Sequence, residues 1–118
     1  MIDSKALATQ IAEILDSKGA TDIQILEVGH MTSITDFFVV ASGRNVQSVA
    51  TLAEDVEEHL CEEEGIEPRR KEGKNGARWI VLDYAHVIVH IFHPEERQYY
   101  NIERLWQDGG NQEPFPVQ

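Results

Sequence analysis

The chain has 118 residues, which fits one domain with a modest core, and 42% of them are hydrophobic, which argues against a largely disordered chain. Its 21 acidic and 10 basic residues give a net charge of −11, and so acidic a surface disfavours direct binding to bulk nucleic acid or anionic lipid, because both are negatively charged. A basic protein partner is favoured instead, although acidity that serves only solubility explains the charge equally well.

The first half of the chain predicts two amphipathic helices and two strands. Apolar residues recur at helical spacing in two segments, each preceded by capping residues and followed by Gly19 or Gly65. The second strand is almost continuously apolar, which is typical of a central strand covered on both faces. The helices are expected over residues 3–18 and 45–64, the strands over 22–28 and 37–41, and a loop over 29–35.

The second half predicts three strands and a third helix. An edge strand is expected after Pro68, and two dense β runs follow over residues 78–83 and 87–92. The short Tyr84-Ala85-His86 connection predicts that these runs form an antiparallel hairpin. Pro94 suits the first turn of a helix that extends to Gln107 with an interruption near Asn101.

The order of elements predicts the fold class. A strand–helix–strand crossover plus a hairpin gives an α/β domain with a mixed five-stranded sheet and helices packed on it. Residues 1–108 form this domain in the prediction. Residues 109–118 contain two glycines and two prolines, and they are expected to form a flexible C-terminal tail.

Three histidines, His86, His90 and His93, are the first candidates for metal binding. On a strand, however, His86 and His90 would lie about 13 Å apart. Two ligands on one zinc ion need bonds of about 2 Å each, so no metal site is expected. His90 is instead expected to be a partly buried or interface polar group.

Catalysis has little support in the sequence. Ser42 follows an apolar strand, but the glycine that a nucleophile elbow needs before it is Ala41, and no phosphate-binding glycine loop occurs in the chain. Ser42 is therefore interpreted as part of a turn that caps the next helix. Asp83 and Asp36 lack the neighbouring carboxylate that a two-metal site requires. No catalytic residue and no cofactor are expected.

An aromatic and arginine-rich set in the last third predicts a protein interface, because Trp, Tyr and Arg dominate the centres of interfaces. In a strand, Trp79, Val81 and Asp83 share one face, and Ile80 and Leu82 share the other. Both rows are largely apolar, so one should pack on helices and the other should receive a partner. A sheet covered by helices on both faces, or a homodimer, would explain the pattern as well. The set is Trp79, Tyr84, Tyr99, Tyr100 and Trp106, with Arg78, Arg97 and Arg104 beside it.

Location is predicted from what the sequence lacks. No apolar run approaches the roughly 20 residues that span a bilayer, and residues 1–5 have no signal or transit character. The single Cys61 excludes an internal disulfide. A cytoplasmic protein without a membrane partner is expected.

Five segments, in this order and spacing, resemble the ribosome-silencing factors, also called the Iojap family. They cover nearly the whole chain from about residue 7 to residue 106. The segments are SITDFFVVASG (33–43), EG (72–73), WIVLDY (79–84), VIVHIF (87–92) and EERQYYNIERLW (95–106). One departure is the connection at 84–86, where many relatives carry a glycine.

The resemblance implies a fold similar to a nucleotidyltransferase without its catalytic carboxylates. It implies a translational repressor that binds the large ribosomal subunit through its ribosomal protein fourteen and sterically blocks joining with the small subunit. Little direct contact with nucleic acid and a homodimer when free of the ribosome are also implied. Trp79 and Asp83 match the interface tryptophan and the acidic strand end, and His90, Arg97 and Tyr100 match motif positions near the same surface. Tyr84 closes the same motif and joins the partner-binding set.

Two alternatives to this function remain open at the level of the sequence. One is a metal-dependent, nucleotidyltransferase-like enzyme. The other is a homodimeric scaffold that uses the aromatic surface for itself.

Overall fold

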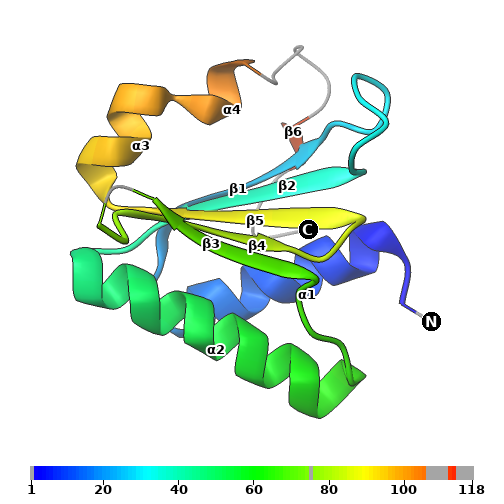
Figure 1. Cartoon of the computed structure of the whole chain (residues 1–118). Coiled ribbons are helices and arrows are strands. Elements are labelled where there is room, and N and C mark those ends of the chain that lie inside the picture. Colours follow the sequence, from blue (N-terminus) through cyan, green and yellow to red (C-terminus); the bar gives the residue numbers. More distant parts are fainter. Residues whose placement is uncertain (1, 75, 106–111, 114–118) are drawn as a thin grey trace.

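The computed structural model describes residues 2–74, 76–105 and 112–113, and it shows a mixed sheet with helices on both faces (Figure 1). Every helix and strand that the sequence predicts is present, with shifts of only a residue or two where both ends are described. Trp106 and Gln107, the predicted end of the third helix, lie outside the described residues. The elements are α1 Ser4–Ser17, β1 Thr21–Glu27, β2 Phe37–Ser42, α2 Val46–Glu64, β3 Arg70–Lys74, β4 Trp79–Asp83, β5 Val87–Phe92, α3 Pro94–Tyr100, α4 Ile102–Leu105 and β6 Gln112–Glu113.

The strands are ordered β3-β4-β5-β2-β1-β6. Only β2 and β5 pair in parallel, and the other described pairs are antiparallel. The α/β class and the five predicted strands are confirmed. The sheet gains a sixth strand because Gln112 and Glu113 pair with Leu26 and Ile25 of β1. The remainder of the predicted flexible tail lies outside the described residues.

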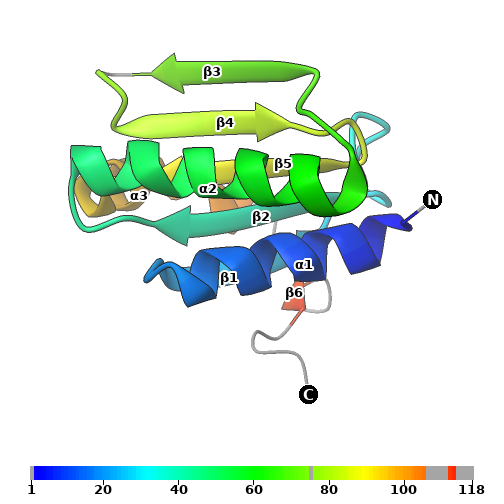
Figure 2. The same ribbon diagram turned by 90° about the horizontal axis from the view of Figure 1, so that it is seen from below.

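Side chains alternate along the strands and divide the apolar residues into two cores. The larger core lies between the sheet and the helices α1 and α2, which run side by side across one face (Figure 2). The smaller core lies on the opposite face, which α3 and α4 cover only in part (Figure 1). The fully buried residues at the centre of this second core are Leu26, Val28, Val40 and Phe92.

The long helices begin and end where their capping residues predict. The side chain of Asp3 accepts a hydrogen bond of 2.8 Å from the backbone N–H of Ala6, and Asn45 accepts one of 2.8 Å from Ser48. Each bond satisfies a backbone donor that a helix N-terminus otherwise leaves unpaired. At the end of α2, Gly65 adopts φ 67°, a left-handed conformation that glycine adopts without strain. None of the helices in the described part of the chain has the length and apolarity needed to cross a membrane.

The predicted hairpin is present, and its turn holds Ala85 in a left-handed conformation. β4 and β5 pair antiparallel with Asp83 opposite Ile88. The Asp83 carboxylate accepts a hydrogen bond of 2.8 Å from the backbone of Ala85, and Ala85 adopts φ 73°. A glycine would take this left-handed conformation at lower energy, so the alanine turn is formed at a small conformational cost.

The third helix is interrupted where the sequence predicts. Pro94 occupies its first turn, and Asn101 ends it in a left-handed conformation with φ 48°. Asparagine tolerates this conformation better than most residues. The chain then turns back into α4, where Ile102 packs against the smaller core. This turn places α3 and α4 over one end of the sheet.

Candidate protein-binding surface

The partly covered face of the sheet carries a row of apolar side chains that remain partly exposed. Along β4 the burial alternates, with Ile80 and Leu82 buried toward α2. We call the opposite row and its neighbours the Trp79 face. It comprises Trp79, Val81 and Asp83 of β4, Ile88 and His90 of β5, and Tyr100 of α3. All of these except the buried His90 are partly or largely exposed.

The Trp79 ring is held in place by contacts with other rings. It stacks on Phe92 with centroids 4.8 Å apart and lies 4.9 Å from the ring of Tyr100. The ammonium group of Lys74 lies 5.4 Å from the centroid of the indole, within the range of a cation–π interaction. The indole is therefore packed against Phe92, Tyr100 and Lys74, while part of it stays accessible to solvent.

His90 lies diagonally opposite Trp79 on β5 and is the hydrogen-bond partner of its indole. The indole N–H of Trp79 donates a hydrogen bond of 3.1 Å to Nδ1 of His90. The imidazole is 6% exposed and lies edge-on to Phe38 at 4.9 Å. Burial, with the nearby Lys74 ammonium adding to it, lowers the pKa of His90 to about 4. A neutral ring that accepts at Nδ1 carries its proton at Nε2, and within the described part of the chain this buried atom has no hydrogen-bond partner.

The lowered pKa of His90 predicts acid-dependent stability. The unfolded chain binds a proton near pH 6.5 and the folded chain only near pH 4. The stability that the neutral form provides is therefore complete above pH 6.5 and is lost as the pH falls to 4, by up to about 1.4 kcal/mol per pH unit. Urea unfolding at pH 6.5 and 4.5 should show a smaller loss for His90→Phe than for the wild type. Equal losses would contradict the assignment.

Asp83 lies at the C-terminal end of β4, and its carboxylate forms contacts with neighbouring residues of the chain. Its Oδ1 accepts from the backbone of Ala85 and forms a 3.1 Å ion pair with Arg69. The carboxylate is 17% exposed. Asp83 therefore belongs to the Trp79 face, but its first role is to hold the hairpin turn against the edge of the sheet.

The edge strand β3 lines the Trp79 face with charges. Arg70 and Lys74 pair with Asp83 and Trp79 in the ladder, and Glu72 lies between them opposite Val81. The two cations lie 3.6 and 3.8 Å from the Glu72 carboxylate. Exposed pairs at such distances contribute little to stability, so these side chains can rearrange when a partner binds.

Two residues of the predicted binding set are not exposed on this face. Tyr84 is 8% exposed and belongs to the larger core, on the α2 side of the sheet. Burial, and secondarily the Glu57 carboxylate, raises the pKa of its hydroxyl group. Arg97 is 7% exposed, and its guanidinium donates a 3.0 Å hydrogen bond to Oγ of Ser42. Both side chains are largely buried in the free chain, which disfavours their direct contact with a partner, and their partner-binding role stays a prediction.

The structure reveals exposed apolar residues that the sequence reasoning missed. Ile34 is 67% exposed and Met31 is 40% exposed, both in the loop between β1 and β2. Tyr99, which belongs to the predicted aromatic set and was not missed, is 82% exposed beside Tyr100. The sequence offers only a weak signal for Ile34, an isolated isoleucine in a loop otherwise rich in glycine and hydroxyl groups.

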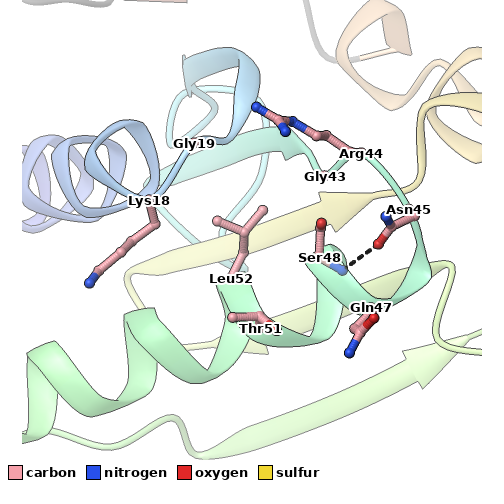
Figure 3. Close-up of a pocket in the computed structure, with 9 residues that line it drawn as sticks. All are labelled: Lys18, Gly19, Gly43, Arg44, Asn45, Gln47, Ser48, Thr51 and Leu52. Atoms are coloured by element: carbon pink, nitrogen blue, oxygen red, sulfur yellow. Dashed lines mark hydrogen bonds between the residues drawn. The ribbon is translucent and has the colours of Figure 1, made fainter.

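A pocket of about 400 Å³ lies at the N-terminus of α2, away from the Trp79 face (Figure 3). Lys18 and Arg44 are its charged residues, and no carboxylate lines it. Ser42 lies outside it and accepts from Arg97. Asn45 caps α2, so the predicted capping role of the Ser42 turn falls to Asn45 three residues later.

The histidines and carboxylates of the described residues do not gather into a group of three or more able to hold a metal ion. The Nδ1 atom of His90 is occupied by the Trp79 indole. His86 lies 3.4 Å from a carboxylate oxygen of Asp36 across the loop. That oxygen also accepts a 2.6 Å hydrogen bond from Ser4, which ties the start of α1 to the sheet.

Comparison with known proteins then identifies the family. The sequence model of RsfS, described as "Ribosomal silencing factor during starvation", matches residues 1–117. The chain belongs to the RsfS family. The expected kinship with the ribosome-silencing factors is thereby confirmed, and the family is one of regulatory proteins.

Curated relatives match over most of this chain and over about half or more of their own length. The ribosomal silencing factor RsfS of Bacillus subtilis is 34% identical over 107 residues, covering 91% of this chain and 90% of the relative. Protein Iojap of the maize chloroplast is 27% identical over 115 residues, covering 95% of this chain and 47% of the maize protein. The mouse protein named "Mitochondrial assembly of ribosomal large subunit protein 1" is 29% identical, and 47% of its length is covered.

Solved structures share the RsfS fold of this chain. A crystal structure of a protein from Chromobacterium violaceum superposes with a TM-score of 0.84 at 31% identity, covering 96% of this chain and 91% of the other. A crystal structure of a protein from Bacillus halodurans gives a TM-score of 0.68 at 36% identity, covering 85% and 90%.

Proposed function

We propose that this RsfS family member represses translation by binding the large ribosomal subunit through the Trp79 face. The partner is ribosomal protein fourteen, and the bound chain sterically blocks joining with the small subunit. The observation that carries the proposal is a tryptophan whose ring contacts Phe92 and Tyr100 and yet stays partly exposed.

The packing around Trp79 favours tight recognition. Binding normally costs free energy because interface side chains lose rotamer freedom. Here the ring contacts and the hydrogen bond to His90 already restrict the indole in the free protein. Val81 and Ile88 lie beside it as further partly exposed apolar groups. A rigid aromatic anchor among apolar neighbours is typical of the energetic centre of a protein interface.

Charge favours a basic partner for the same surface. The chain carries a net charge of −11, which attracts a basic protein and speeds encounter. Glu72 and Asp83 supply carboxylates at the edge of the Trp79 face. Arg70 and Lys74 at the same edge would repel such a partner unless they turn aside, and their weak pairing with Glu72 allows this movement.

The name of the mouse relative supports the large subunit as the partner, since it refers to assembly of that subunit. We further propose that the chain catalyses no reaction, acts in the cytoplasm and has a fold related to an inactive nucleotidyltransferase. A homodimer of the free chain, formed through the exposed aromatic surface, completes the proposal.

Density-gradient sedimentation with purified ribosomal subunits tests the function. The wild-type chain should move with the large subunit, remain at the top with the small subunit, and be displaced from the large subunit by excess isolated ribosomal protein fourteen. A chain that stays at the top with both subunits would contradict the proposal. Equilibrium sedimentation of the free chain would then decide whether the aromatic surface forms only a dimer.

A further inference from the structure

The hydrogen bond between Trp79 and His90 joins two neighbouring strands across the exposed face. In the β4–β5 ladder Trp79 is opposite Phe92 and His90 is opposite Val81, so the two bonded residues are diagonal neighbours. Diagonal pairs in an antiparallel sheet are within reach when one side chain is long and aromatic. The indole N–H therefore points inward along the sheet, to Nδ1 of His90 at 3.1 Å.

A histidine at position 90 is unfavourable for the stability of the fold. Its Nε2 atom is buried and has no hydrogen-bond partner among the residues that the structure describes, and leaving a buried polar group unpaired lowers the stability of the fold. A phenylalanine would fill the space between Phe38 and Trp79 without that cost. The specific contribution of the histidine is thus the acceptor that it presents to the indole.

This acceptor determines the orientation of the Trp79 ring, which packing alone leaves undetermined. The terminal torsion of a tryptophan is broad and roughly two-fold. Stacking on Phe92 and Tyr100 fixes the plane of the ring, but a ring turned over in that plane would stack on the same neighbours. Only the orientation with the N–H toward His90 satisfies the indole donor inside the protein, so the hydrogen bond selects which edge of Trp79 faces outward.

We propose that His90 is a positioning residue that sets the orientation of Trp79 for the ribosomal partner without touching that partner itself. This inference rests on the proposed function for the role of Trp79 as the contact. The orientation of the indole is a property of the free protein, and it can be measured whether or not the ribosome binds.

A matched pair of variants separates the acceptor from polarity in general. His90→Asn places its amide oxygen at the same number of bonds from the backbone as Nδ1. His90→Gln places its amide near the position of Nε2, one bond farther from the backbone than the atom that accepts from the indole of Trp79. In both variants, nuclear magnetic resonance of the free protein measures solvent exchange of the Trp79 indole N–H, assigned by the signal lost in Trp79→Phe.

The indole N–H should exchange slowly in the wild type and in His90→Asn, and quickly in His90→Gln. Losing one hydrogen bond should weaken binding of His90→Gln to the large subunit by about tenfold, and His90→Asn should bind close to the wild type. His90→Phe should unfold at an equal or higher temperature than the wild type and yet share the fast exchange and weak binding of His90→Gln.

Equal indole exchange in the Asn and Gln variants would overturn the proposal, and so would fast exchange with unchanged binding. Weaker binding of His90→Phe with slow exchange would also overturn it, because the effect would not act through Trp79. A wild-type chain that fails to bind the large subunit would refute the proposed function instead, while the exchange rates still decide how His90 orients the ring.

Discussion

Replacing Trp79 by alanine should weaken binding to the large ribosomal subunit by about 30- to 900-fold, since truncating a central interface tryptophan costs about 2–4 kcal/mol. The ring is partly exposed on the Trp79 face and is held against Phe92, Tyr100 and His90. Titration of labelled chain with purified large subunits, followed by sedimentation, measures the change. The fold should persist, because the larger core lies on the other face of the sheet.

Some loss of stability will accompany this change, because Trp79 also packs on the smaller core. Ile66→Ala is the matched control: Ile66 is partly buried against the larger core, after α2 and away from the Trp79 face. It should lower the free energy of unfolding without changing affinity. Affinities reduced equally in the two variants would attribute the effect to stability, and wild-type affinity in Trp79→Ala would remove the residue from the binding surface.

Replacing Phe92 by alanine should lower the free energy of unfolding by about 3–5 kcal/mol, because it removes a fully buried aromatic side chain and leaves a cavity. Phe92 is 0% exposed, belongs to the smaller core and stacks beneath Trp79. Domains of this size have a total stability of only about 5–15 kcal/mol, so the variant should be close to unfolding at physiological temperature.

Urea unfolding of Phe92→Ala and Phe92→Leu measures this contribution. The leucine variant keeps most of the buried volume and should lose about 1.5 kcal/mol or less. Because the indole would lose its support, Phe92→Ala should also bind the large subunit more weakly at temperatures where it remains folded. A loss below about 1 kcal/mol for the alanine variant would show that the smaller core is not a tightly packed layer.

The local structure of this chain follows closely from short-range patterns. Helical spacing of apolar residues, the caps Asp3 and Asn45, and Gly65 fix the long helices within a residue or two. Asn101 interrupts the third helix because it tolerates the left-handed conformation. The alternation of Trp79, Ile80, Val81 and Leu82 also predicts the two faces of β4 correctly.

Features that depend on long-range packing do not follow from such patterns. The sequence gives no sign that Arg97 is buried. In the structure α3 packs over the end of β2, and Arg97 contacts Ser42, which lies 55 residues earlier in the chain. Tyr84 is different, because the alternation along β4 already places it on the face of Ile80 and Leu82, with the larger core. The two-residue strand β6 pairs through backbone bonds and has no side-chain signature.

The partner-binding set is accordingly narrower than the sequence suggests. His90 and Tyr100 contact the indole ring of Trp79 at one end of β4, and Asp83 lies at the other end of that strand. Tyr84 and Arg97 support the sheet from within. The motif therefore combines exposed residues with residues that hold them in place, and only the three-dimensional arrangement separates the two groups.

Subunit joining tests the central claim most directly. Purified large subunits are incubated with the chain, small subunits are added under conditions that favour association, and the fraction that forms whole ribosomes is measured by gradient sedimentation. The wild-type chain should keep the subunits apart in proportion to its occupancy of the large subunit, and Trp79→Ala should allow them to join as they do without the chain. Whole ribosomes forming normally in the presence of saturating wild-type chain would contradict the account.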